Sequence, residues 1–310
     1  MALLTDDLAG NPVTGQRWIR RSLPALQTAL QAEGYQLSCN TIRRLLHKHN
    51  IRPKSNVKRL HPLPHLDRDR QFGYIQAQRQ RFARAALPII SVDTKKRELI
   101  GLFYQGGQSW EAVAPSVYLH DFPSDASGKA IPYGIYDVGH NRGYMYVGVS
   151  ADTPDFAVTA LVQWWQAYGQ VGYPQANELL ILADGGGSNG YRPRRWKQQL
   201  QVQWVDVFGL SVTVCHYPPG ASKWNPIEHR LFSQISKTWA ATPLTSIEVL
   251  LACLRATETT TGLTVEATLI EQVFETGLTV SDDEMATLAI EKHATCPKWN
   301  YTIKPRENGK

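Results

Sequence analysis

Short apolar runs and longer segments with helical spacing alternate along residues 88–240. The short runs have the length of strands that are buried on both faces, whereas helical spacing places apolar side chains on one face of a helix. The pattern predicts strands at 88–93, 98–103, 131–137, 144–149, 179–183 and 210–215, and helices at 154–168, 194–208 and from Pro226 onward. A row of strands followed by alternating helices and strands predicts an α/β fold, with an RNase H-like mixed sheet flanked by helices.

Two of the predicted strands lead into an aspartate, Asp93 in one case and Asp184 in the other. Four of the six residues that follow Asp184 are glycines, which allow the chain to turn sharply. A third acid, Glu228, falls in the first turn of a helix that Asn225 can cap and Pro226 can begin. Because the first and fourth strands of an RNase H-like sheet are central neighbours, we expect Asp93 and Asp184 to lie side by side, with Glu228 next to them.

Three carboxylates in one poorly hydrated place repel one another unless cations neutralise them. Mg²⁺ is the natural ion, with Mn²⁺ as a substitute, because it prefers oxygen ligands and keeps positions open for a phosphate. Two such ions about 3.5–4 Å apart would activate a hydroxyl nucleophile and stabilise a leaving oxygen. We therefore expect a site with two metal ions held by Asp93, Asp184 and Glu228, without an organic cofactor.

The first 50 residues predict two short helices after a loose lead-in over residues 1–16. Ser22 and Ser38 stand at N-cap positions, and a glycine separates the two helices. The second helix, residues 39–48, combines an apolar stripe with a basic polar face. This is typical of a helix-turn-helix, although an ordinary helical hairpin with a solvated face fits the same pattern. The residues of this helix that we expect to contact DNA are Thr41, Arg43, Arg44 and Lys48.

The segments before and after the predicted sheet, residues 51–87 and 241–310, have patterns other than short buried strands. Residues 51–87 begin as a basic, proline-containing linker and continue as a basic amphipathic helix. The tail has helical spacing at 246–257 and 281–292 and carries no recognisable chemistry. The predicted organisation is a small all-α helix-turn-helix segment at 1–50, a linker and helix at 51–87, a catalytic domain at 88–240, and a helical extension packed on that domain at 241–310.

The amino-acid composition limits which kinds of binding partner and which cellular compartment fit this chain. The chain has 310 residues, 43% of them apolar, which is enough for a sizeable core. Its formal net charge of +6 favours an anionic partner. The four cysteines are far apart in sequence, which indicates neither a disulfide framework nor a zinc site and fits a reducing compartment. No apolar run approaches the ~18 residues of a membrane span, so we expect a cytoplasmic protein associated with the nucleoid.

Two other sets of residues compete for the catalytic role. Ser188 lies in a G-x-S-x-G pattern with Asp206 and His216 downstream, as in an α/β hydrolase, but Asp184 takes the position where the nucleophilic serine should stand. Asp137 also ends a predicted strand and is our second choice for a metal ligand, with a structural salt bridge as its alternative role. Asp121 and Asp125 are further competing carboxylates.

Several polar and aromatic residues stand close to the three acids in sequence. Basic side chains in such places commonly contact DNA phosphates, although each alone can be an ordinary surface charge. Trp224 can stack on a base or be buried in the core. The expected DNA contacts of this region are Lys95, Lys96, Lys223, Trp224, Asn225 and Arg230.

Seven stretches of the chain together resemble the ISAzo13 group of bacterial insertion-sequence transposases. The stretches are Ile90 to Lys96, His120 to Pro123, Pro132 to Asp137, Ala183 to Gly190, Pro218 to Arg230, Thr261 to Leu263, and Trp299 to Ile303. The resemblance covers nearly the whole chain. It implies a DDE transposase with an RNase H-like catalytic domain, and it places the three acids at Asp93, Asp184 and Glu228.

The resemblance and the predicted acids imply one reaction and leave two alternatives. The expected activity is hydrolysis of a phosphodiester at a transposon end, followed by attack of the freed 3′-hydroxyl on target DNA, by a homo-oligomer assembled on DNA. The alternatives are a structure-specific nuclease of the same fold and a DNA-binding remnant without catalysis. Members of the group are usually longer at the N-terminus, so we expect this chain to be a shortened copy.

Overall fold

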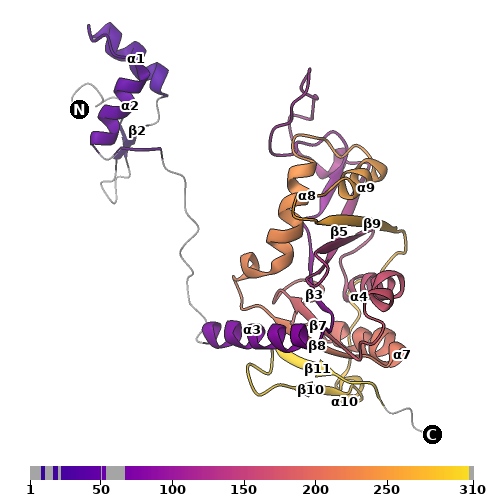
Figure 1. Ribbon diagram of the computed structural model, residues 1–310. Coiled ribbons are helices and arrows are strands. Elements are labelled where there is room, and N and C mark those ends of the chain that lie inside the picture. The colour runs from indigo at the N-terminus through magenta and orange to yellow at the C-terminus, as the bar shows by residue number, and fades with distance from the viewer. Residues whose placement is uncertain (1–7, 11–16, 20–21, 50, 54–66, 307–310) are drawn as a thin grey trace. The chain divides into compact units, whose positions relative to one another are not determined.

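The computed structural model describes residues 8–10, 17–19, 22–49, 51–53 and 67–306. The chain divides into two compact units, residues 1–60 and residues 61–310 (Figure 1). The proline-containing part of the predicted linker, residues 54–66, lies outside the described residues. No helix within the described ranges has the length and apolar character needed to cross a membrane.

The N-terminal unit contains the two predicted helices. Helix α1 (Leu23–Ala32) begins after Ser22, whose side chain accepts a hydrogen bond from the backbone N–H of Ala25, and α2 (Cys39–Lys48) begins in the same way after Ser38. Both helices were predicted and are confirmed. The loose lead-in and the all-α character of this segment are wrong where β1 (Leu8–Gly10) pairs antiparallel with β2 (Arg17–Ile19). The rest of the lead-in lies outside the described residues.

The larger unit is built on a nine-stranded sheet with the order β10-β11-β8-β7-β3-β5-β6-β9, while β4 pairs with β5 beside this path. The central strand β3 runs parallel to β7 and antiparallel to β5, and β7 runs parallel to β8. This is the strand order of an RNase H-like sheet, so the fold prediction is confirmed. The five inner strands are β3 (Ile89–Thr94), β5 (Gly128–Asp137), β6 (Arg142–Gly148), β7 (Glu178–Ala183) and β8 (Ser211–His216).

The segment 98–103 does not continue a meander from β3, as was predicted. Only Glu98–Ile100 forms a strand, β4, and it pairs with residues 128–130 of β5 rather than with β3. The reason is the length of β5, which spans ten residues. Its second half pairs with β3, and its first three residues extend past the end of β3, where β4 completes their hydrogen bonding.

The tail contributes strands to the sheet as well as helices. Helix α9 (Ile247–Arg255) is confirmed, but the second predicted helix is only α10 (Asp282–Ala286), and β10 (Ile290–Lys292) follows it. Strand β9 (Thr264–Ile270) pairs parallel with β6, and β11 (Asn300–Ile303) pairs antiparallel with β8. A purely helical tail was therefore the wrong expectation, because these segments hydrogen-bond to strands that would otherwise be sheet edges.

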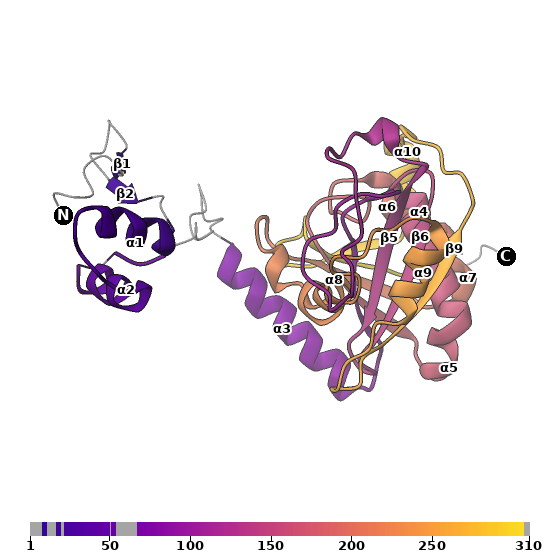
Figure 2. The ribbon, with the colours of Figure 1, turned by 90° about the horizontal axis from the view of Figure 1, so that it is seen from above.

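Helices cover both faces of the sheet (Figures 1 and 2). On one face, α4 (Pro154–Trp164) and α6 (Arg194–Gln199) pack with the π-helical segment 200–205 around Trp164, Trp196 and Trp204. On the other face lie α3, α9 and the helix that continues from residue 228 into α8. The short α5 and α7 extend the first layer. These helices span α3 (Arg68–Arg84), α5 (Gln170–Gly172), α7 (Asp206–Phe208) and α8 (Ser233–Thr238).

A glycine in β5 allows this last helix to lie close to the centre of the sheet. Gly134 pairs with Asp93 of β3 in the antiparallel register. A Cβ atom at Gly134 would lie 2.5 Å from the Phe232 ring and 2.8 Å from Ile227. Both contacts are shorter than packed carbon atoms tolerate, so the helix can hold this place only while residue 134 has no side chain.

Replacing Gly134 with alanine tests this close approach. We expect Gly134→Ala to lower the free energy of unfolding by about 1–3 kcal/mol, because the added methyl group overpacks the interface between β5 and the helix. The matched control is Gly128→Ala in the same strand, where an added Cβ meets nothing within 4 Å. Urea-induced unfolding followed by circular dichroism would measure both, and equal midpoints for the two variants would contradict the expectation.

Candidate active site

The register of the two central parallel strands places Asp93 and Asp184 next to each other. Val92 of β3 pairs with Ala183 of β7, and the two aspartates are the next residues along the two strands. Adjacent strands lie about 4.8 Å apart, so the side chains leave neighbouring positions at the carboxyl ends of the sheet. Both aspartates are partly buried. The structure thus brings these two predicted acids together.

Glu228 reaches the same place from the helix on the covering layer. It begins the π-helical segment Glu228–Phe232 that continues into α8. The residue before it, Ile227, is fully buried, and its backbone N–H donates a hydrogen bond of 3.1 Å to Ser91 Oγ of β3. Because Ser91 and Asp93 point to the same face of the strand, this bond attaches the start of the helix beside the two aspartates.

The ionisation of the two aspartates is altered by burial and by the neighbouring acids. Burial, and then the charges of Asp184 and Glu228, raise the pKa of Asp93 to about 8. Burial and the charge of Glu228 also raise the pKa of Asp184 to about 6, while a hydrogen bond from Asn225 opposes this rise. Raised pKa values mean that the ionised acids are unfavourable at this site in the absence of a compensating positive charge.

The two aspartates offer oxygen atoms of the kind that a hard divalent cation prefers as ligands. Asp93 Oδ1 accepts a hydrogen bond of 2.8 Å from the Thr94 backbone N–H, and Asp184 Oδ1 accepts one of 3.1 Å from Asn225 Nδ2. Among the described residues no hydrogen bond is directed at the second oxygen of either aspartate. No group of three His, Cys, Asp or Glu side chains within the described ranges is gathered closely enough to hold an ion. Carboxylate oxygens are the ligands that Mg²⁺ and Mn²⁺ prefer.

Asn225 holds the site together from inside the protein. We expected it to contact DNA, but its side chain is fully buried, so this expectation is wrong. Its Oδ1 accepts a hydrogen bond from Ser91 Oγ, and its Nδ2 donates to Asp184 Oδ1. Its backbone carbonyl accepts a hydrogen bond of 3.1 Å from the Glu228 N–H. One uncharged residue therefore links β3, the Asp184 carboxylate and the helix of Glu228.

The other expected DNA contacts near the acids differ in exposure. Lys95 is not a free cation, because its ammonium lies 3.5 Å from Glu98 Oε1 and 4.6 Å from the centre of the Trp239 ring. Burial lowers the pKa of Lys95. Trp224 is half exposed. Its ring lies edge-on to the ring of Phe72, with the two ring centres 5.9 Å apart, so the Trp224 side chain is only partly covered. The remaining residues of this set are exposed: Lys96, Lys223 and Arg230.

The basic face of α2 is exposed within the N-terminal unit. Arg43, Arg44 and Lys48 are accessible, and the only hydrogen bond that Arg43 makes within the described residues runs to Asn40 Oδ1 on the same helix, at 3.3 Å. Thr41 is partly buried and shares a 3.0 Å hydrogen bond with Ser38 Oγ at the helix start. Three of the four predicted DNA contacts of α2 are therefore available to a ligand.

The alternative serine site is not assembled. His216 is buried, and its Nδ1 lies 2.9 Å from the backbone carbonyl oxygen of Asp184 rather than near Ser188. Burial lowers the pKa of His216 to about 4, which keeps the ring neutral. Asp206 forms an ion pair with Arg306, and no hydrogen bond joins it to His216 among the described residues. These residues cannot act as a nucleophile, base and acid triad.

Asp137 lies at the wrong end of β3 to join Asp93 and Asp184. It pairs with Ile90, at the start of β3, whereas the acids stand at the end of that strand. Its carboxylate accepts hydrogen bonds from the Tyr173 hydroxyl at 2.7 Å and from the backbone of Gly139 and His140. Asp137 is thus a structural residue. The other two competing carboxylates, Asp121 and Asp125, are exposed in the loop before β5.

Sequence reasoning missed two residues of the site. Ser91 could have been found from its position two residues before Asp93, which places both on one face of a strand. Asp152 lies in the loop between β6 and α4, and its Oδ1 accepts a hydrogen bond of 3.2 Å from Thr94 Oγ1. Its charge contributes to the raised pKa of Asp93. No short motif connects Asp152 to the other acids, so only the fold reveals it.

A family model described as the Rhodopirellula transposase DDE domain matches residues 1–305. No curated protein matches the chain. Among solved structures, the chain is similar to the Mos1 transposase paired-end complex with left transposon end, at 15% identity over 76% of this chain and 70% of that chain, with a TM-score of 0.44. It is similar also to the Mos1 mariner paired end complex with Mn, at 14% identity over 77% and 71% of the two chains, with a TM-score of 0.43.

Removing the Asn225 side chain tests its structural importance. We expect Asn225→Ala to lower the free energy of unfolding by about 1–3 kcal/mol, because the buried Ser91 hydroxyl loses its acceptor. The matched control is Asn177→Ala, since Asn177 is exposed in the loop before β7. Chemical unfolding of both variants would measure the difference, and a stability of Asn225→Ala within about 0.5 kcal/mol of the control would contradict the expectation.

Proposed function

The chain belongs to the family of the Rhodopirellula transposase DDE domain, and from this we propose that Asp93, Asp184 and Glu228 are the acids with which it cuts and joins DNA. The chain is a DDE transposase, and the ISAzo13 resemblance of its sequence is confirmed. The observation that carries the assignment of the acids is their convergence. At one end of the sheet, the charges of Asp184 and Glu228 act on the Asp93 carboxyl, and the charge of Glu228 acts on Asp184.

The proposed reaction has two steps at these acids. Hydrolysis of a phosphodiester at the transposon end frees a 3′-hydroxyl, and this hydroxyl then attacks a phosphodiester of target DNA in line. Divalent metal ions, two Mg²⁺ or Mn²⁺ per site, would supply the positive charge that both steps require. Asp93, Asp184 and Glu228 would hold them, while Asn225 keeps the Asp184 carboxylate in place through its 3.1 Å hydrogen bond.

The N-terminal unit is proposed to bind the transposon end. Helix α2 has ten residues, or about 15 Å of helix, which fits in a major groove. It presents Arg43, Arg44 and Lys48 on its exposed face. The formal net charge of +6 agrees with a polyanionic partner. Assembly of several copies on DNA stays a prediction.

Neutralising each acid tests the catalytic assignment. We expect Asp93→Asn, Asp184→Asn and Glu228→Gln each to reduce strand cleavage at least about a thousandfold, because the charge that holds the metal ions is lost, while DNA binding is largely retained. Cleavage and joining of a duplex that carries the end of the encoding element would be measured with Mg²⁺. The control is Asp121→Asn, a charge removed from an exposed loop.

Three results would oppose this assignment in different ways. Mg²⁺-dependent cleavage by Asp184→Asn at the wild-type rate would remove Asp184 from the site. Cleavage without joining of a pre-cut end would indicate a nuclease rather than a transposase. DNA binding that is indifferent to Mg²⁺, in a wild-type protein that never cuts, would indicate a remnant without catalysis.

Metal binding can be tested without DNA. We expect millimolar Mn²⁺ to raise the unfolding temperature of the wild-type protein by several degrees, because an ion that binds only the folded state stabilises it by about 2.7 kcal/mol at a hundredfold excess over its Kd. Asp184→Asn and Glu228→Gln should respond much less. Differential scanning fluorimetry at constant ionic strength would measure this, with Asp121→Asn as control. Equal shifts in all four proteins would argue against an ion held by these acids.

A further inference from the structure

A cavity of about 1060 Å³ lies at the edge of the sheet that β10 forms. Its wall is built from the residues after the glycine-rich loop of β7, helices α6 and α10, strand β10, and β11 with the segment before it. None of the three proposed catalytic acids lines it. Among the described residues of this wall, five are cations and one is an acid: Arg192, Arg194, Lys197, Lys292, Lys298 and Asp282.

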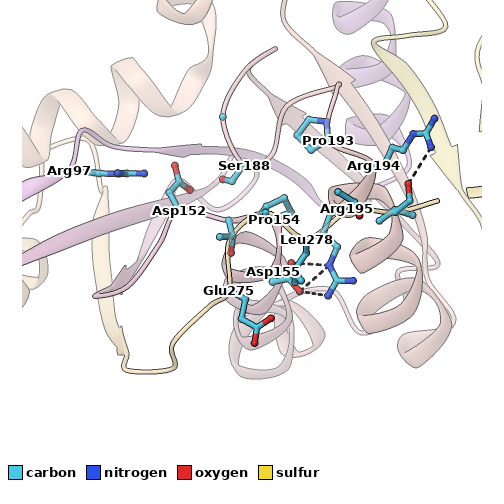
Figure 3. Close-up of a pocket in the computed structure, with 15 residues that line it drawn as sticks. Arg97, Asp152, Pro154, Asp155, Ser188, Pro193, Arg194, Arg195, Glu275 and Leu278 are labelled. Atoms are coloured by element: carbon cyan, nitrogen blue, oxygen red, sulfur yellow. Dashed lines mark hydrogen bonds and ion pairs between the residues drawn. The ribbon is translucent and has the colours of Figure 1, made fainter. Parts of the chain in front are cut away.

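The one acid of the wall is already paired with Arg194. Arg194 Nη1 lies 2.6 Å from Asp282 Oδ1 and donates a hydrogen bond of 3.2 Å to the backbone carbonyl of Val280. The second bond is drawn in Figure 3, which looks into a neighbouring cavity that has Arg194 in its wall as well. Asp282 therefore neutralises Arg194 and leaves the other cations of the wall without a counter-charge.

Lys197 is the partly buried cation of this wall, whereas the other four are exposed. Its ammonium donates a hydrogen bond of 2.5 Å to the Tyr191 carbonyl and lies 5.5 Å from the centre of the Tyr301 ring. Burial lowers the pKa of Lys197, and the positive charges of Lys292 and Arg194 lower it further. No carboxylate within the described ranges forms an ion pair with it. A partly buried cation among other cations is stabilised by an anion that enters the cavity.

Three exposed cations surround Lys197 at the rim: Arg192, Lys292 and Lys298. None of them has an ion-pair partner in the part of the chain that the structure describes. Arg192 Nε donates a hydrogen bond of 3.1 Å to the Tyr191 hydroxyl, which holds the guanidinium beside that ring. Several like charges around one hollow attract a ligand that carries more than one negative charge.

A phosphate monoester fits these charges better than the phosphodiester of an intact DNA strand. The monoester carries about −1.5 to −2 charges at neutral pH and presents three strong acceptor oxygens. An internal phosphodiester carries one charge and is joined to chain on both sides. The wall also has apolar surface against which the sugar or base attached to the phosphate can pack: Tyr191, Met285, Leu288, Ile290 and Pro297.

Tyr191 connects the cavity to the segment that follows Asp184. It comes directly after the glycine-rich loop, and a Cβ atom at Gly185 would lie 3.5 Å from the Tyr191 ring. The ring also lies edge-on to that of His216, with the ring centres 6.1 Å apart. A ligand that contacts Tyr191 would thus touch a residue packed beside the strand end of a proposed catalytic acid.

We propose that this cavity binds a terminal phosphate monoester, with Lys197 inside and the three exposed cations around the phosphate. Two sources present this chemistry. One is a free nucleotide. The other is the 5′-phosphate of a cut DNA strand, and this source rests on the proposed function, because hydrolysis that frees a 3′-hydroxyl leaves a 5′-phosphate on the other fragment.

Matched pairs of ligands test the proposal without strand cleavage. Isothermal titration calorimetry, without divalent metal and at constant ionic strength, compares a short single-stranded oligonucleotide that carries a 5′-phosphate with the same oligonucleotide that carries a 5′-hydroxyl. A second pair is AMP and adenosine. For the wild-type protein we expect the phosphorylated member of at least one pair to bind about tenfold more tightly or better, because charge-assisted hydrogen bonds are gained. A preference confined to the oligonucleotide assigns the cavity to DNA ends, and a preference that AMP shares assigns it to free nucleotides.

Removing single charges identifies the residues that hold the phosphate. We expect Lys197→Gln to reduce the preference for the phosphorylated ligand to about threefold or less. The double variant Lys292→Gln, Lys298→Gln should do the same. It changes only exposed residues, so it decides the test if Lys197→Gln does not fold. The matched control is Lys129→Gln, an exposed lysine of β5 outside this wall, which should retain the full preference.

Two results overturn the proposal. One is a wild-type protein that binds both members of each pair equally, and the other is a preference that the rim double variant retains in full. General attraction of DNA to a basic surface would weaken both oligonucleotides alike and leave their ratio unchanged. Mg²⁺-dependent cleavage by Asp184→Asn would instead remove the proposed function, so the two failures are distinguishable.

Discussion

Repulsion between carboxylates at one end of a parallel strand pair is the constraint on which this structure depends. Asp93 and Asp184 leave adjacent strands at the same level, and the charge of Glu228 acts on both. A folded protein accepts such an arrangement only if rigid surroundings enforce it or a cation compensates it. Here the enforcing contacts are uncharged hydrogen bonds. Asn225 and Ser91 connect the strand, the carboxylate and the helix without adding a charge that would compete for a metal ion.

The packing of the sheet makes this arrangement rigid. On one face the three tryptophans Trp164, Trp196 and Trp204 fill the space under α4 and α6. On the other, Gly134 lets the helix of Glu228 come close enough to contact β3 and β5. A larger residue at position 134 would move the helix, and Glu228 with it, away from the two aspartates. The site therefore depends on the absence of a side chain in β5 as much as on the presence of the three carboxylates.

Helix α3 and strand β11, which are far apart in sequence, meet close to the backbone of Asp184. Gln71 of α3 and Asn300 of β11 are both fully buried and bond to each other through their amide groups at 2.6 and 2.8 Å. Gln71 also donates a hydrogen bond of 2.9 Å to the carbonyl oxygen of His216, and the His216 ring lies against the carbonyl oxygen of Asp184. The helix that follows the linker and the last strand of the sheet thus both support the strand ends that carry the acids. The tail is part of the framework of the site.

Local sequence alone determined most of the elements and indicated the three acids that we propose for catalysis. Buried strands, capped helices and an aspartate after an apolar run depend on neighbouring residues, so the pattern around Asp93 and Asp184 was sufficient. It could not determine which strands would pair, and residues 264–270 and 300–303 took places beside β6 and β8 that only the assembled sheet offers. It also misjudged Asn225 and Lys95, because burial depends on what the rest of the chain packs over a position. The contribution of Asp152 and the basic cavity at Lys197 arose only where segments distant in sequence met, which sequence neighbours do not specify.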